Sequence, residues 1–173
     1  LKSEPEKKPK ICLLVHQDYA MDGRVRAYTG FLRDSRAQID VICVRGRYNS
    51  KSRPVDHAHV HRILLRRFAT GGGYFLEYIL GFLLYSIWLT YFHLRNRYDI
   101  IHVHNMPDFL VFTALLPRLL GAKIILDIHD PMPEFFMSKF NVGASNLLVR
   151  VLRMQEKMSA GFAYKVITAN ESL

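Results

Sequence analysis

The stretches Asp99-Ile-Ile-His-Val-His-Asn-Met-Pro-Asp108 and Lys123-Ile-Ile-Leu-Asp-Ile-His-Asp-Pro-Met-Pro-Glu134 decide the fold of this 173-residue chain. Each opens with a short run of β-branched and aliphatic residues. Such a run is too short for a helix, and it is apolar enough to form a strand that is buried on both faces. Each run then ends in a cluster of His, Asp, Asn and Pro. The pattern predicts two parallel strands that both lead into functional loops.

The segment between these strands, 107–121, carries apolar residues at helical spacing, with Pro107 in the first turn and Gly121 just past the last. A strand, a helix and a second strand form a right-handed crossover, so we expect an α/β fold with a mainly parallel, doubly wound, Rossmann-like sheet. Ligands of such sheets bind beyond the carboxyl ends of the strands. The polar residues at these two ends are His104, Asn105, His129, Asp130 and Glu134.

Similar patterns predict the other elements. Strands are expected at 10–15, 38–44, 58–64 and 164–169, and helices at 23–33, 74–97 and 145–162. The strand at 58–64 alternates polar and apolar residues, which places it near a sheet edge. Segment 131–140 is expected to form short, proline-interrupted helical turns, and 171–173 to begin another helix. The predicted inward stripes are Val25, Tyr28, Phe31 and Leu32 in the first helix, and Leu148, Val151, Leu152, Gln155 and Met158 in the last.

The composition fits one domain, 10–173, preceded by a polar tail at 1–9. Its 24 Lys and Arg against 15 Asp and Glu give a net charge of +9, which suggests nucleic acid, an anionic membrane or phosphorylated substrates as partners. No recognition motif or zinc spacing supports nucleic acid. A membrane partner and a merely solvated basic surface both remain open. Cys12 and Cys43 lie in predicted strands, and we interpret them as buried free thiols of a reducing compartment.

The loop after the first strand lacks the Gly-x-Gly-x-x-Gly pattern of dinucleotide sites, which disfavours NAD and FAD. Asp22 is a candidate cap for the following helix. Gly23 and Arg24 open this helix, and its free backbone N–H groups, its dipole and the arginine together favour an anion. Thr70-Gly-Gly-Gly73 lacks the Lys-Ser/Thr of a P-loop and is interpreted as a hinge.

Two groups of histidines raise the question of a metal. His57, His59 and His61 have no Cys or carboxylate set at ligand spacing, so we interpret them as surface histidines. His102 and His104 share one face of their strand, and some hydrolases hold a divalent metal with such a pair. A metal-dependent hydrolase is therefore an alternative function. It requires convergent carboxylates, whereas Asp127 is expected to orient a neighbouring side chain.

Segment 74–97 is a nearly continuous apolar stretch whose length approaches a membrane span. A span would divide a βαβ domain between the two sides of a bilayer, so we disfavour it. Two interpretations stay open. One is a helix that packs on the sheet and turns its surplus Trp and Tyr toward lipid headgroups, and the other is a simply buried helix.

The strings YDIIHVHNMPD and GAKIILDIHDPMPEFF, with DGRVRAYTGFL before them and YKVITANES after them, carry a resemblance in their order and spacing. From about Lys10 to the last residue the chain resembles the N-terminal domain of a retaining GT-B glycosyltransferase of family 4. The resemblance implies that His129 is catalytic through transition-state positioning and that the loop at Gly23 and Arg24 approaches the donor diphosphate. It implies further substrate contacts from His104, Asn105, Asp130 and Glu134.

The resemblance also implies a full-length enzyme that moves a sugar from a nucleotide sugar to an acceptor in polysaccharide, glycolipid or related glycoconjugate synthesis, with no metal or other cofactor. The donor pocket and paired glutamates of that family belong to a C-terminal domain that follows this one, so the chain alone is expected to be inactive. A binding domain without catalysis is the second alternative. Expected partners are the donor-binding domain, a nucleotide sugar, a glycan or lipid-linked acceptor and the anionic inner face of the cytoplasmic membrane, but no nucleic acid.

Overall fold

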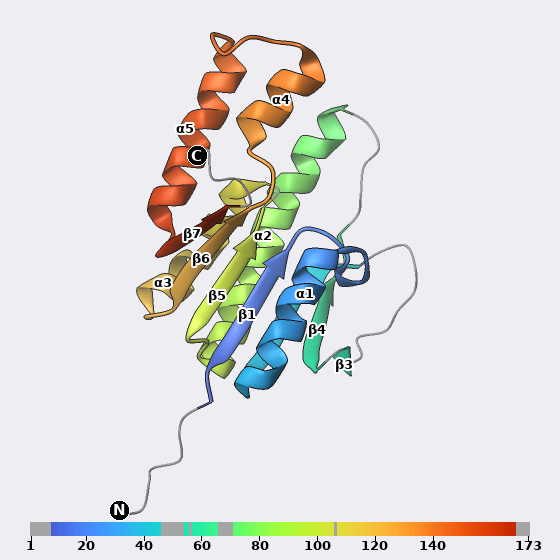
Figure 1. The fold of residues 1–173 in the computed structure, drawn as a ribbon, viewed down its shortest axis with the longest axis vertical. Coiled ribbons are helices and arrows are strands. Elements are labelled where there is room, and N and C mark those ends of the chain that lie inside the picture. Colours follow the sequence, from blue (N-terminus) through green and yellow to red (C-terminus); the bar gives the residue numbers. More distant parts are fainter. Residues whose placement is uncertain (1–7, 46–53, 56, 66–70, 106, 169–173) are drawn as a thin grey trace, which may run out of the picture.

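The computed structural model describes residues 8–45, 54–55, 57–65, 71–105 and 107–168. The predicted features at 1–7, 46–53, Arg66, Arg67, Thr70 and 169–173 lie outside these residues. Figure 1 shows one twisted sheet with helices on both of its faces. The strands are β1 Lys10–Val15, β2 Gln38–Val44, β3 Pro54–Val55, β4 Ala58–Ile63, β5 Ile100–His104, β6 Lys123–Ile128 and β7 Lys165–Thr168.

The strand order is β3-β4-β2-β1-β5-β6-β7, and every pairing is parallel except that of the two-residue β3 with β4. The chain winds outward from β1 to β2 and β4 on one side, and then from β5 to β6 and β7 on the other. The order therefore reverses between β1 and β5. This confirms the predicted α/β class and its mainly parallel, doubly wound sheet, with β4 one strand from the edge.

Two apolar clusters lie on the two faces of the sheet, because successive residues of a strand point to opposite sides. One face is covered by α1, which contributes Val25, and the other by α2 and η3, which contribute Tyr85 and Leu110. Cys12 belongs to one cluster and Cys43 to the other, and both are buried free thiols, as predicted. The helices are η1 Tyr19–Met21, α1 Gly23–Leu32, η2 Arg33–Ser35, α2 Gly71–Asn96, η3 Asp108–Ala114, α3 Leu115–Leu119, α4 Met132–Phe140 and α5 Leu147–Phe162.

Helix α1 begins where the sequence predicts, because the Asp22 carboxylate accepts from the backbone N–H groups of Arg24 and Val25. Its inward stripe was wrong at one position: Phe31 is 82% exposed. Val25 and Thr29 are four residues apart and face the sheet. At 100° per residue, the Phe31 side chain points to a different side of the helix from both Val25 and Thr29.

The predicted single helix at 107–121 is instead the 3-10 helix η3 followed by the one-turn helix α3. Pro117 explains the break, because it has no N–H to donate to Thr113 and its ring crowds that carbonyl in a continuous α-helix. Within the first turn of α3 the missing N–H costs nothing. Gly121 follows with a φ of 100°, the left-handed conformation that favours glycine after a helix.

Two predictions on the C-terminal helices were also wrong. Segment 131–140 forms one continuous helix, α4, because Pro131 precedes it and Pro133 lies in its first turn, where proline is tolerated. In α5 the buried side chains are Val149 and Ser159, whereas most of the predicted inward stripe is exposed. The exposed members of that stripe are Leu148, Val151 and Met158.

Helix α2 packs on the sheet through a face that includes polar residues and leaves an apolar face exposed. Its sheet-facing residues recur every fourth position and include buried Glu77 and His93, while Gly81 lies so close to His16 that a Cβ would be 3.3 Å from that ring. The opposite side is exposed and apolar, and we call it the outer stripe. It consists of Leu76, Ile79, Leu80, Leu83, Ile87, Trp88, Tyr91 and Leu94. Among the described helices, none combines the length and apolar character that crossing a membrane requires.

A buried carboxylate fixes the C-terminal end of α2 to the sheet. Asp40 of β2 accepts hydrogen bonds from Tyr98 Oη and Asn96 Nδ2. Burial alone would raise the pKa of Asp40, but its contacts with His61 and Tyr98 outweigh burial and lower it. His61 is therefore not the surface residue that the sequence predicts, and its ring lies 4.0 Å from that of Phe92. His57 and His59 are exposed.

Candidate active site at the carboxyl edge of the sheet

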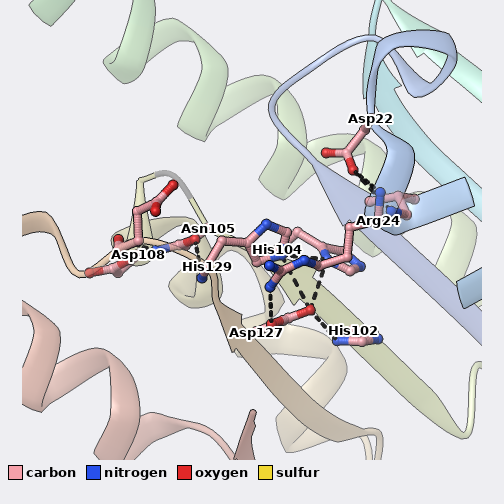
Figure 2. A network of polar contacts seen from close by, with 10 residues as sticks. Asp22, Arg24, His102, His104, Asn105, Asp108, Asp127 and His129 are labelled. Carbon is pink, nitrogen blue, oxygen red and sulfur yellow. Dashed lines mark hydrogen bonds and ion pairs between the residues drawn. The ribbon is translucent and has the colours of Figure 1, made fainter. Parts of the chain in front are cut away.

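The site lies where β1, β5 and β6 end side by side, at the point where the strand order reverses (Figure 2). Alternation along β5 puts His102 and His104 on the α1 side of the sheet, and alternation along β6 puts Asp127 there. The parallel register pairs His104 directly with Asp127. Helix α1, which follows β1, brings Arg24 over the same point.

The Asp127 carboxylate is fully buried at the centre of this cluster. Its Oδ2 atom lies 3.2 Å from His129 Nε2 and 3.4 Å from His104 Nδ1. The third imidazole, that of His102, approaches the same oxygen to 3.8 Å through Nε2. On the other side, Arg24 Nη1 lies 3.6 Å from Oδ1. One carboxylate thus serves four basic side chains, which come from α1, β5 and the end of β6.

Burial and charge set the ionisation of this cluster. Burial alone would raise the pKa of Asp127, but its contacts with His104 and His129 outweigh burial and hold the pKa well below its usual range. Burial, assisted by His104, lowers the pKa of His102 to about 3. At neutral pH the centre is therefore a carboxylate, and His102 beside it is a neutral imidazole.

The histidine rings are also packed against one another and against α1. His104 Nδ1 lies 3.2 Å from His129 Nε2, which is hydrogen-bond distance. Tyr28 of α1 meets the ring of His102 edge-on at 4.7 Å and lies 5.4 Å from that of His104. Burial, and next the charge of Asp127, raise the pKa of Tyr28, so that it remains a phenol. Tyr28 therefore covers the cluster on the side of α1.

Asn105 ties the two loops together. Its Oδ1 accepts from the backbone N–H of His129 at 2.8 Å, and its Nδ2 donates to Asp108 Oδ1 at 2.8 Å and to the Asp130 carbonyl at 2.9 Å. Among the described residues, the partners of the Asn105 side chain are all groups of this chain, and Asn105 itself is buried. Asn105 thus sets the position of His129 relative to β5.

The remaining candidates lie in different environments. Gly23 opens α1 and is exposed, but the N–H groups of the next two residues, Arg24 and Val25, already donate to Asp22. The Asp130 side chain is exposed at the end of the β6 loop. Glu134 faces α5, where Arg153 Nη2 lies 3.9 Å from its carboxylate. The cluster therefore gathers Arg24, His104, Asn105 and His129, while Glu134 forms a separate ion pair.

Sequence reasoning considered His102 only as half of a possible metal pair, and it did not select Tyr28 or Asp108 as site residues. His102 and Asp127 carried a usable signal, because each is a polar residue inside an otherwise apolar buried strand. Tyr28 carried none, since an aromatic residue on the inner face of a helix is usually part of the core.

His102, His104 and Asp127 bring possible metal-ligand atoms within 4.8 Å of one another. Two features indicate that these side chains form an ion-pair network rather than a metal site. The Arg24 guanidinium already supplies positive charge to this carboxylate. In addition, His104 Nε2 is buried with no acceptor among the described residues, whereas a ligating histidine normally donates its other N–H.

A cavity of about 350 Å³ opens beside the cluster, between α1 and β7. Arg24 and Tyr28 contribute to its wall, so the side chains that cover Asp127 also face this cavity. The exposed ring of Phe31 lies on it as well. Its full lining is Arg24, Ala27, Tyr28, Phe31, Ile167 and Thr168.

Several solved structures share the fold of this chain. Sucrose-phosphate synthase from Thermosynechococcus elongatus superposes with a TM-score of 0.66 at 14% identity, over 92% of this chain and 42% of its own. Glycyrrhiza uralensis UGT73P12, solved with glycyrrhetinic acid 3-O-monoglucuronide, gives 0.65 at 11% identity over 95% and 44%. Acinetobacter baumannii MurG gives 0.56 at 10% identity over 96% and 42%. The chain thus spans less than half the length of each structure.

The fold of this chain, with its polar cluster at the switch point, matches one half of the GT-B architecture. Residues 22–173 match the model of the glycosyl transferase 4-like domain, and the chain belongs to that family. No match was found among curated proteins.

Proposed function

We propose that this domain is the acceptor-side half of a retaining glycosyltransferase. The complete enzyme moves a sugar from a nucleotide sugar to a glycan or lipid-linked acceptor in polysaccharide, glycolipid or related glycoconjugate synthesis. The bond from the anomeric carbon to the diphosphate oxygen breaks, and a bond to the acceptor oxygen forms. The acceptor proton leaves with the diphosphate. No metal takes part, and the domain alone is inactive because the donor pocket belongs to the second domain.

In this proposal His129 is the catalytic side chain and acts by positioning. Asn105 fixes its backbone and Asp127 holds its ring, so the imidazole has one preferred orientation at the mouth of the site. A fixed dipole at the reacting centre stabilises developing charge without reorganisation. Arg24, exposed at the same edge, is suited to the donor diphosphate, with Gly23 leaving space beside it. Asp130, whose side chain is exposed, is available for acceptor hydroxyls, and Glu134 would bind one in exchange for its ion pair with Arg153.

The observation that carries the proposal is the convergence of His129, His104 and Arg24 on one buried carboxylate at the switch point. The test uses the protein that carries this domain together with a donor-binding domain. His129→Ala should lower the rate of sugar transfer by about 100-fold or more while the protein keeps its fold. His59→Ala is the matched control, since His59 is an exposed histidine on β4.

Equal rates for both variants would contradict the assignment of His129. Sugar transfer by the 173-residue chain alone would contradict the proposal that it is half an enzyme. If the two-domain protein binds acceptors and nucleotide sugars but never joins them, a binding function without catalysis is the better description.

We further propose that the enzyme works as a peripheral protein at the inner face of the cytoplasmic membrane. The outer stripe of α2 is an exposed apolar surface larger than isolated surface residues provide, and Arg95 and Arg97 are exposed at its C-terminal end. Each basic residue near anionic lipid contributes about 1 kcal/mol. Together with a net charge of +9, this supports reversible binding without a span.

Cosedimentation with neutral and anionic liposomes at low and high salt tests this. The chain should sediment with anionic vesicles, less so at high salt, and a variant with Arg66→Glu, Arg67→Glu and Arg95→Glu should remain in solution. Trp88 is the only tryptophan and is 38% exposed, so lipids brominated in the acyl chain should quench its fluorescence. Recovery of both proteins in the supernatant for every lipid would rule out membrane binding.

A further inference from the structure

A second hollow lies on the other face of the sheet from α1. Four residues on one side of α2 and the ring of Phe109 in η3 enclose a groove of about 220 Å³. The Phe109 ring lies 6.1 Å from the rings of both Tyr78 and Phe82. Ile79 and Leu83 complete the lining, so every lining residue is aliphatic or aromatic. The groove therefore has no charged or amide group with which to hold a polar ligand.

The groove opens onto the outer stripe of α2, and one of its residues is next in sequence to the hydrogen-bond network that holds His129. On one side, Ile79 and Leu83 belong to the outer stripe of α2. On the other side, Phe109 directly follows Asp108, whose carboxylate accepts from Asn105, the residue that holds His129. Tyr78 also contacts the ring of His16, which follows the end of β1. Figure 1 shows the N-terminal half of α2 rising beyond the tips of the strands, at the edge where the site lies.

An apolar groove that opens onto the exposed outer stripe, and one wall of which is formed by η3, the element that follows the site residues of β5, fits an amphipathic molecule. We propose that this groove binds the hydrocarbon chain of a lipid-linked acceptor, whose polar head then reaches toward Asp130 and His129. The inference rests on the proposed function, and it narrows the acceptor from glycans in general to molecules with a lipid anchor. Apolar burial favours such a chain in proportion to the surface removed from water.

Because groove residues such as Leu83 are exposed, they can be substituted without loss of the fold. Leu83 is 52% exposed and lines the groove, whereas Ile87 is 64% exposed on the same stripe, one turn further along α2 and outside the groove. Leu83→Glu and Ile87→Glu are therefore a matched pair, and Ile79→Glu is a second groove variant. Circular dichroism and thermal unfolding of each variant establish that it is folded.

The probe is farnesyl phosphate, used below its micelle concentration with the 173-residue chain, and its affinity is measured by isothermal titration calorimetry. We expect binding that farnesol competes for and inorganic phosphate does not. Leu83→Glu and Ile79→Glu should each raise the Kd at least tenfold, while Ile87→Glu should leave it within twofold. A diazirine on the farnesyl chain should label the peptides that carry Phe82 or Phe109.

No binding, or equal weakening by Leu83→Glu and Ile87→Glu, would overturn the groove proposal. Competition by inorganic phosphate would overturn it too, because the phosphate and not the chain would then be recognised. The proposed function fails separately: a two-domain protein that binds the probe in this groove but transfers no sugar would refute the transferase. Sugar transfer to lipid-linked acceptors at the same rate and KM in Leu83→Glu would refute only the groove.

Discussion

Asp40 and Asp127 are both buried carboxylates in parallel strands, yet their partners differ in kind. Asp40 lies near the start of β2 and accepts hydrogen bonds from a phenol and an amide, with one imidazole, that of His61, at 3.9 Å. Asp127 lies near the end of β6, where three imidazoles and a guanidinium lie within 3.8 Å of its oxygens. Neither of its oxygens has a well-directed hydrogen bond among the described residues.

This difference separates the two ends of the sheet. At the amino end, the Asp40 network joins α2 to β2 with short, directed hydrogen bonds, which is how a structural carboxylate is stabilised. At the carboxyl end, Asp127 holds basic side chains that include the partly exposed His129 and Arg24. We therefore expect changes at Asp127 to act on catalysis and changes at Asp40 to act on stability.

The largest effect is expected for Asp127→Asn in the two-domain protein. The amide keeps the size of the side chain but removes the charge that holds His129, so the rate of sugar transfer should fall by about 100-fold or more. Initial rates at saturating donor measure this, and urea unfolding checks that the fold is kept. A rate within a factor of three of the wild type would remove the distinction between the two carboxylates.

Asp40→Ala should have the largest effect on stability. It leaves Tyr98 Oη and Asn96 Nδ2 without their common acceptor, so the free energy of unfolding should fall by about 3 kcal/mol. Urea titration measures the change, with exposed Asp34→Ala as the control, for which about 0.5 kcal/mol or less is expected. If Asp40→Ala also lowers the activity per folded molecule, Asp40 contributes to the site as well as to stability.

Tyr98→Phe sharpens the comparison by removing one hydrogen bond to Asp40 and leaving the carboxylate in place. The expected loss is about 1.5–2 kcal/mol, the lower part of the usual range for a hydrogen bond to a charged group. The same urea titration measures it. A loss as large as that of Asp40→Ala would mean that Asn96 and His61 contribute nothing to holding the carboxylate.

The smallest effect concerns pH. Burial, and next the charge of Asp108, raise the pKa of Glu156 in α5, so the folded state holds this proton more tightly than the unfolded state does. The stability it contributes is present in acid and lost as the pH rises above about 4.5. Glu156→Gln should therefore raise the free energy of unfolding by a few tenths of a kcal/mol at pH 7, because solvent screens much of the interaction.

Below about pH 4, Glu156→Gln should leave the free energy of unfolding unchanged. The pKa of Asp40 is shifted downward, so its contribution has the opposite sign: it is present above the usual carboxyl pKa of about 4 and is lost as the pH falls below it. Urea titrations of Glu156→Gln and Asp40→Asn at pH 3.5 and 7 compare the two. Equal effects of both substitutions at both pH values would contradict these shifts.

The sequence by itself determined the parallel strands of the sheet, though not the two-residue β3, together with their winding and the pairing of site residues along each strand. Runs such as Lys10–Val15 and Gln38–Val44 match the observed strands at both ends, since a buried parallel strand needs only a local apolar run. Asp22 was predicted as the cap of α1 for the same reason, because a cap bonds within its own turn. The alternation that puts His102 beside His104 is likewise a local property of an extended chain.

Only the tertiary structure decided which sides of α2 and α5 pack on the rest of the domain and which distant side chains meet at the site. Helices that are apolar nearly all round, such as α2, have no single inward stripe to read, so the sheet selects Glu77 and His93 and leaves Leu83 and Ile87 outside. The approach of Arg24 to Asp127 joins residues 103 positions apart in the chain, and no local pattern encodes it. These contacts follow from the packing of α1 over the ends of β5 and β6, a long-range arrangement that sequence periodicity does not specify.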